Sequence, residues 1–146
     1  MNNHKKTLML KTICYISDSM HNESLKNIED LYLKARTNNA KNNITGILMY
    51  TDRNFLQVLE GEETIVDATF KKICADIRHK NIFNIIDSPI EQRIFEDYNF
   101  GFTTINNKQE LNNLFEYLNW LKNADCDCAN KVIAMVENFI MKNKQS

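Results

Sequence analysis

An amide and a phenol are the two side chains of this sequence whose types and placement suggest chemistry. Gln57 stands inside the apolar run 55–59, and side chains on a strand alternate between its two faces. Both faces of this run are apolar, so Gln57 is predicted to be a buried amide, and each group of a buried amide left unpaired costs about 1–3 kcal/mol. The carbonyl and NH2 group of Gln57 therefore need partners in the protein, in water or in a ligand.

Tyr15 is the candidate partner of this amide. It lies on an apolar stretch at 7–17 that predicts a first strand, on which Ile13 and Ser17 share its face. If this strand lies beside the strand that carries Gln57, the phenol and the amide can meet. Judged on its own strand alone, Gln57 could equally be satisfied by neighbouring backbone groups.

The elements that position these side chains follow from the spacing of apolar residues. The pattern predicts helices from a cap at Ser24 to about Thr37 and from 62 to about 79. Further strands are predicted at 44–50, 54–60, 82–88 and about 98–104, with Pro89 ending the third of these. In chain order these elements predict an α+β, ferredoxin-like βαββαββ sandwich, with two helices on one face of a sheet.

The chain beyond residue 104 is predicted to cover the opposite face of the sheet. Two helical stripes of apolar residues occur there, one at Leu111, Leu114, Phe115, Leu118 and Leu121, the other at Val132, Met135, Val136 and Ile140. We therefore expect a first domain at 1–104 and a C-terminal helical appendage at 105–146. Trp120 is interpreted as a packing residue of this appendage.

Composition argues against several classes of function. The 146 residues suit one domain, and 18 Lys and Arg against 19 Asp and Glu give a net charge of −1 with no basic block. Nucleic acid is therefore not an expected partner. No apolar run approaches the roughly 20 residues that cross a bilayer, and no signal peptide is recognisable, so we expect a cytoplasmic protein without a membrane partner. Cys126 and Cys128 lack a second pair of ligands, so no metal site is expected.

The sequence resembles the BLUF domains, a family of flavin-binding blue-light sensors, from about residue 11 to residue 102. The resemblance rests on the order and spacing of several motifs. These are Cys14-Tyr15-Ile16-Ser17, Asn38-Asn39, Ile44-Thr45-Gly46-Ile47-Leu48, Phe55-Leu56-Gln57-Val58-Leu59-Glu60-Gly61, Asp76-Ile77-Arg78-His79, Arg93-Ile94-Phe95 and Gly101-Phe102. The domain at 1–104 is then expected to be a BLUF flavin-binding domain.

The resemblance implies a photoreceptor that binds FAD non-covalently, with FMN or riboflavin as possible alternatives. Tyr15 and Gln57 would be its photoactive residues, with Gln57 between the phenol and the flavin ring. Blue light would move an electron and a proton from Tyr15 to the flavin, and their return would leave the amide rotated or tautomerised. An amide suits this switch because its donor and acceptor ends differ.

The resemblance also implies a set of cofactor-binding residues. Asn38 and Asn39 match asparagines that hold the polar edge of the ring, although asparagine is also common where a helix ends. Two positions depart from the family pattern, because Tyr98 and Phe100 replace the usual Trp and Met of the last strand. Phe100 has no thioether that could accept a hydrogen bond from the switched amide, which leaves open the route by which the signal is passed on.

The second predicted helix supplies the remaining candidates. Lys72, Asp76 and His79 fall at i, i+4 and i+7, which places them on one helix face together with Ile73. By the resemblance this face approaches the flavin and its ribityl-phosphate chain, and Arg78 reaches a ring carbonyl. A solvated helix face with an Asp–His pair is the alternative interpretation.

The expected function is a sensor and not an enzyme. Since the chain has no predicted enzymatic domain, the signal is expected to leave through a downstream signalling protein or through a change in self-association as a homo-oligomer. A flavin-dependent oxidoreductase is one alternative, but no glycine-rich dinucleotide motif occurs among Gly46, Gly61 and Gly101. A light-insensitive interaction module of the same fold is the other alternative.

Overall fold

A twisted sheet forms the centre of the computed structural model, which describes residues 9–19, 25–50, 54–76, 79–96, 101–104, 108–122 and 127–144. Within these ranges the sheet has five strands in the order β4-β1-β3-β2-β5. The strands are β1 (Leu10–Ser19), β2 (Thr45–Tyr50), β3 (Asn54–Glu62), β4 (His79–Ile90) and β5 (Gly101–Thr104). Neighbouring strands are antiparallel except β2 and β5, which run parallel.

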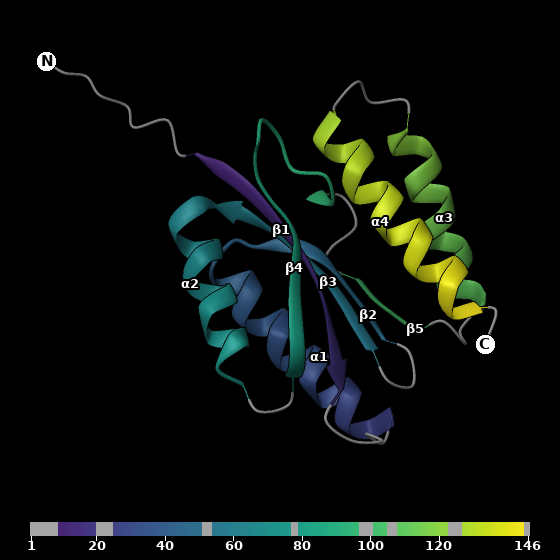
Figure 1. Cartoon of the computed structure of the whole chain (residues 1–146), viewed down its shortest axis with the longest axis horizontal. Coiled ribbons are helices and arrows are strands. Elements are labelled where there is room, and N and C mark those ends of the chain that lie inside the picture. The colour runs from purple at the N-terminus through teal and green to yellow at the C-terminus, as the bar shows by residue number, and fades with distance from the viewer. Residues whose placement is uncertain are drawn as a thin grey trace, which may run out of the picture.

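Helices cover the sheet on both sides (Figure 1). One face carries α1 (Leu25–Lys41) and α2 (Glu63–Cys74), and the other carries α3 (Lys108–Leu121) and α4 (Asp127–Lys144). This arrangement confirms the predicted ferredoxin-like sandwich with two C-terminal helices on the opposite sheet face. In the part of the chain that the structure describes, every helix is too short or too polar to span a bilayer.

Strand β3 contributes to two separate hydrophobic cores, as its alternating sequence predicts. Phe55 and Leu59 pack among the residues beneath α1 and α2, whereas Leu56 and Val58 pack beneath α3 and α4. The second core is closed by residues of the two predicted C-terminal stripes, including Leu111, Leu114, Leu118, Val132, Val136 and Ile140. The cores lie on opposite faces, so a central strand such as β3 is buried on both sides.

Gly46 sets the close approach of β2 to β3. Its φ is +152°, and a Cβ atom placed there would lie 1.8 Å from the carbonyl oxygen of Val58. Only glycine fits such a position without moving a strand. The resulting register places Leu48 of β2 directly opposite Gln57 of β3.

The observed ends of α1 and β4 differ from the predicted ones. Helix α1 continues past Thr37 to Lys41, so the Asn-rich stretch forms its last turn, and the chain reverses at Asn43, where φ is +55°. Strand β4 runs through Pro89 to Ile90. Proline is tolerated there because β4 is an edge strand, whose outward-facing N–H groups need no ladder partner.

Helix α2 is shorter than its sequence pattern predicts. It ends at Cys74, and the N–H groups of Ala75 and Asp76 close its last turn on the carbonyls of Lys71, Lys72 and Ile73. The chain must leave the helix there because β4 already begins at His79, which pairs with Ser19 of β1. The prediction that Lys72, Asp76 and His79 share one face of one helix is therefore wrong.

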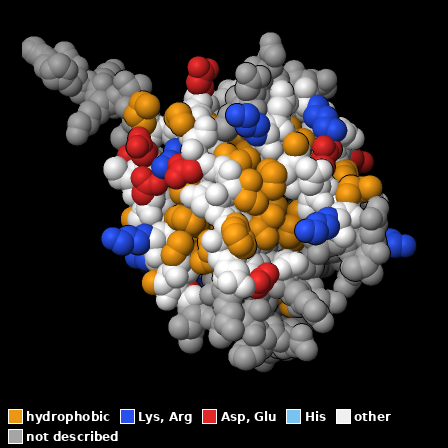
Figure 2. All heavy atoms as spheres, in the orientation of Figure 1, with side chains coloured by type: hydrophobic (Ala, Val, Ile, Leu, Met, Phe, Trp, Pro, Cys, Tyr) orange, Lys and Arg blue, Asp and Glu red, His pale blue; other side chains and the backbone are white. Residues whose placement is uncertain are grey.

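Several large apolar side chains remain at the surface. Phe83 and Ile85 of edge strand β4 are exposed, and Figure 2 shows hydrophobic side chains gathered in the middle of the face that β4 crosses in Figure 1. Trp120 of α3 is 61% exposed, so the prediction that it is a packing residue is wrong. Tyr98 and Phe100, the two departures from the family pattern, lie outside the described residues.

Candidate functional site

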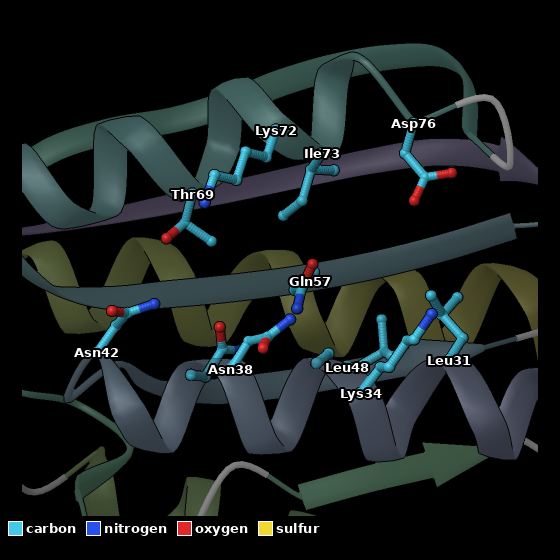
Figure 3. A pocket seen from close by; sticks show the side chains of 12 residues that line it. Leu31, Lys34, Asn38, Asn42, Leu48, Gln57, Thr69, Lys72, Ile73 and Asp76 are labelled. Atoms are coloured by element: carbon cyan, nitrogen blue, oxygen red, sulfur yellow. The ribbon is translucent and has the colours of Figure 1, made fainter.

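A cavity of about 270 Å³ lies between α1 and α2, with the sheet as its floor. This volume is near the lower end of the range of small-molecule pockets, roughly 300–1,000 Å³. Apolar walls come from Leu31, Ala35, Leu48 and Ile73. Polar groups line the rest, namely Lys34, Asn38, Asn39, Asn42, Gln57, Thr69, Lys72 and Asp76 (Figure 3). The cavity therefore suits a ligand that is partly apolar and rich in hydrogen-bonding groups.

Gln57 forms the floor of the cavity and bonds to Tyr15. The two residues are direct partners in the β1–β3 ladder, and the phenolic O–H of Tyr15 donates to Oε1 of Gln57. Gln57 is 4% exposed, and Figure 3 shows its side chain pointing into the space between the two helices. The predicted meeting of phenol and amide is thus present, with the amide between Tyr15 and the cavity.

Tyr15 is held in a fully buried position. Its ring packs against Phe70 of α2 at a centroid distance of 5.5 Å. Burial raises the pKa of the phenol well above its usual range, and the nearby Cys74, Cys14 and Asp76 raise it further. Tyr15 therefore keeps its proton at neutral pH and donates it in the hydrogen bond to Gln57.

Asn39 brings a buried polar atom without a partner to the cavity wall. It is 3% exposed, and among the described residues its Nδ2 has no hydrogen-bond partner. Its backbone is fixed, because its carbonyl oxygen accepts a bond of 2.8 Å from the N–H of Ile44. Since a buried amide group without a partner costs about 1–3 kcal/mol, Asn39 is placed for a ligand that accepts a hydrogen bond.

The structure brings together most of the predicted site residues. Gln57, Asn38, Asn39, Lys72, Ile73 and Asp76 all line the one cavity. Asp76 reaches it from the turn after α2 and not from the helix itself. Arg78 lies outside the described residues, and only the backbone of His79 is described. A role of these residues in binding stays a prediction.

The sequence prediction missed several lining residues. Leu31 and Ala35 of α1 pack against the core beneath α1 and α2 and also line the cavity. Their spacing to Asn38 could have revealed them, because residues three and four apart share a helix face. Leu48 was missed because only the β2–β3 register identifies it as the neighbour of Gln57. The other missed lining residues are Lys34, Asn42 and Thr69.

These features define a ligand-binding α+β domain in which a buried Tyr–Gln pair meets a mixed polar and apolar cavity. The profile of the BLUF family, described as "Sensors of blue-light using FAD", matches residues 10–101. The chain belongs to this family.

Two curated relatives illustrate the match. The "Blue light- and temperature-regulated antirepressor BluF" of Escherichia coli (strain K12) is 37% identical over 78 residues, 53% of this chain and 19% of that protein. The "Photoactivated adenylate cyclase subunit alpha" of Euglena gracilis is 35% identical over 86 residues, 59% of this chain and 8% of that protein. The chain thus spans less than a fifth of the length of either relative.

Solved structures match over more of the chain. The BLUF protein BlrB in its dark state has a TM-score of 0.65 and 27% identity, covering 87% of this chain and 97% of its own. BlsA in its photo-activated state has a TM-score of 0.64 and 30% identity, covering 81% of this chain and 98% of its own. Klebsiella pneumoniae BlrP1 has a TM-score of 0.77 and 25% identity, covering 91% of this chain and 34% of its own.

FAD is the cofactor of the family, and the cavity residues fit its flavin ring. The ring has an apolar body and a polar edge with hydrogen-bond acceptors. The cavity offers apolar walls together with the partnerless Nδ2 of Asn39 and the amide of Gln57. The chain thus belongs to a family of blue-light sensors that use FAD, and the residues lining its cavity suit the flavin ring.

Proposed function

We propose that Tyr15 and Gln57 form a light-driven hydrogen-bond switch. When bound, FAD absorbs blue light and becomes a strong electron acceptor in its excited state. Tyr15 is the electron donor, and its hydroxyl proton leaves along the hydrogen bond to Gln57. The electron and the proton then return to Tyr15, so no residue is oxidised or reduced overall. Gln57 is left with its donor and acceptor ends exchanged relative to the cavity.

The observation that carries this proposal is the hydrogen bond from Tyr15 to Oε1 of Gln57. Because Oε1 accepts from the phenol, the NH2 group of Gln57 is the end left to face a ligand in the cavity. Exchange of the two ends would turn a donor toward that ligand into an acceptor. A leucine or a glutamate could not present both patterns.

The cavity walls are proposed to hold the cofactor in place. Asn38 and Asn39 hold the polar edge of the ring, and Ile73 packs against its apolar part. Lys72 and Asp76 lie along the ribityl-phosphate chain. Arg78 and His79 are proposed to complete the site from the segment after α2. FAD, FMN and riboflavin share the ring that these residues contact, so each is a possible occupant in vitro.

The signal is proposed to leave as a change in protein contacts. Residues 1–104 act as the flavin-binding domain, and 105–146 act as the helical appendage that carries the change to the surface. One relative is named a photoactivated adenylate cyclase subunit, and this chain matches 8% of its length. For this chain the recipient is a signalling protein or a second copy of itself, in the cytoplasm.

An absorption spectrum of the FAD-loaded protein before and after blue light tests this function. We expect a small red shift of the flavin bands that reverses in the dark without bleaching. Bleaching to reduced flavin with turnover of a donor would favour an oxidoreductase. Failure to bind any flavin would overturn the proposal and favour the light-insensitive interaction module.

A further inference from the structure

The segment Arg93-Ile94-Phe95 is held by buried hydrogen bonds that flavin binding does not explain. Glu60 of β3 is 0% exposed, and both of its carboxylate oxygens accept hydrogen bonds from this segment. Oε2 accepts the N–H of Ile94 at 2.8 Å, and Oε1 accepts the N–H of Phe95 at 2.6 Å. Oε1 also accepts the hydroxyl of Thr45 at 2.8 Å. Bonds to a buried carboxylate are short and strong, so this segment is tied firmly to β3.

Arg93 ties the same segment to the end of the cavity wall formed by α1. Its guanidinium donates to the carbonyl oxygen of Asn43 at 2.7 Å, to Oγ1 of Thr45 at 2.9 Å and to the carbonyl oxygen of Glu60 at 3.1 Å. Asn43 lies in the turn that follows α1, four residues after Asn39. The segment is therefore connected to β3 and to the turn after α1, two of the elements that carry polar groups of the cavity.

On its other side the segment contacts α3. The hydroxyl of Tyr117 donates to the carbonyl oxygen of Ile94 at 2.6 Å, and its ring stacks on Phe95 at a centroid distance of 5.8 Å. Tyr117 also contacts the ring of Trp120 at 5.7 Å. A continuous set of contacts thus leads from Glu60 to an exposed tryptophan at the surface.

Glu60 and Gln57 lie three residues apart on one strand and point to opposite faces. A movement of β3 that accompanies the switch of Gln57 would therefore displace the Glu60 carboxylate and the N–H groups of Ile94 and Phe95 that it holds. We propose that Glu60 and Arg93 are positioning residues that transmit this movement through Ile94 and Phe95 to α3. This inference rests on the proposed function, because it assumes that light changes the state of Gln57.

The transmission would depend on polar contacts because their geometry is restrictive. A carboxylate that accepts three hydrogen bonds in a buried site cannot shift without either carrying its donors along or leaving them unpaired, which is unfavourable in a buried site. Apolar packing alone would tolerate a small slide of one surface over the other. The hydrogen bonds of Glu60 join β3 to the segment 93–95, which in turn contacts α3 through Tyr117. The surface expected to respond to light is therefore the side of α3 that bears Trp120.

Hydrogen exchange of the FAD-loaded full chain in the dark and under continuous blue light tests the inference, with the flavin red shift recorded on the same samples. We expect the wild type to show a light-dependent change in exchange over 108–122. Glu60→Gln and Tyr117→Phe should keep the red shift but lose most of that change. Glu137→Gln is the matched control, because it alters the ion pair with Lys122 between α4 and α3 without touching 93–95.

The outcomes separate the inference from the proposed function. If the wild type gives the red shift but no light-dependent change in hydrogen exchange over 108–122, the inference alone is overturned. It is also overturned if Glu60→Gln and Tyr117→Phe both keep the same exchange change as the wild type. If Glu137→Gln loses the exchange change to the same degree as the other two variants, the inference is overturned as well. Any weakening of the packing of α3 and α4 would then be enough to abolish the change. If Glu60→Gln does not fold, Tyr117→Phe decides, since it removes a single hydroxyl. Absence of the red shift in the wild type overturns the proposed function itself.

Discussion

Tyr15 and Gln57 face each other directly across the β1–β3 ladder, and the phenol donates its proton to the amide oxygen. Both side chains are buried, and Gln57 also lines the cavity, so a ligand bound there would contact the amide. A phenol that stays protonated and an amide with two unlike ends are the parts that a reversible hydrogen-bond switch requires.

Tyr15→Phe and Gln57→Leu should each bind FAD and fail to give the red shift. Phenylalanine removes the transferable proton and the hydrogen bond to Oε1, and leucine removes the amide that is exchanged. Absorption spectra of the loaded proteins before and after illumination measure this. Tyr50→Phe serves as the control, because Tyr50 lies in the same core beneath α1 and α2 but outside the cavity lining. A normal photoproduct in either of the first two variants would contradict the switch.

The amplitude of the red shift should not change with pH up to about 10, where an ordinary tyrosine is half ionised. Burial raises the pKa of Tyr15, so loss of its proton moves to higher pH, and the donor remains intact through the range in which exposed tyrosines titrate. Spectra at each pH, with circular dichroism as a check on folding, measure this. A folded protein whose shift falls by half near pH 10 would show that the phenol titrates normally.

Asn39→Leu should weaken FAD binding and raise the free energy of unfolding of the flavin-free protein. The buried Nδ2 has no partner among the described residues, so replacing it removes a cost in the empty state and a hydrogen bond in the loaded state. The loss of affinity should be about 0.5–1.5 kcal/mol, up to roughly tenfold in Kd. Flavin titration and urea unfolding measure the two effects.

Ala40→Leu is the control for this prediction. It places the same side chain on the next residue of α1, which is exposed and does not line the cavity. Flavin affinity should be unchanged in this variant. Equal losses in both variants would indicate a general disturbance of α1 and would argue against a role of Asn39 in binding.

Gly46→Ala should lower the free energy of unfolding by about 2 kcal/mol or more, in the range of overpacked cores. The new Cβ would lie 1.8 Å from the carbonyl oxygen of Val58, so β2 and β3 would have to separate. Gly61→Ala is a matched control, since its Cβ would come no closer than 3.2 Å, to the carbonyl oxygen of Asn43. Urea midpoints of the flavin-free proteins compare them, and similar midpoints would contradict the argument.

Periodicity predicted the fold well because most elements bury one clear face. The alternation of Leu56, Gln57 and Val58 predicted which side chains lie on each side of β3, and the C-terminal stripes predicted the helices that cover Leu56 and Val58. The prediction failed at α2, whose helical pattern continues past Cys74. There the pairing of β4 with β1, a contact distant in sequence, ends the helix earlier than the local pattern does.

The site was predictable where one residue type was out of place and unpredictable where the residues were ordinary. Gln57 was conspicuous in an apolar strand, and the register then brought Tyr15 to it. Leu48 and Thr69 have nothing unusual in their local sequence, and only the three-dimensional arrangement brings them to the cavity. The prediction for Trp120 was wrong because its large apolar side chain suggested burial, whereas α3 exposes it to solvent.

The two-sided character of β3 separates sensing from output along a single strand. Odd-numbered residues of the run 55–59 meet the cavity side, and even-numbered ones meet α3 and α4. The pair of C-terminal helices could therefore be exchanged for another pair with matching apolar stripes while every residue of the cavity is kept. Deleting one residue within β3 would instead turn both sets of side chains to the wrong faces. For the construction of chimeric light sensors, the length of this strand is thus fixed, whereas the helices that cover its even-numbered side chains can be replaced if the new pair keeps the contacts of Tyr117 with Ile94 and Phe95.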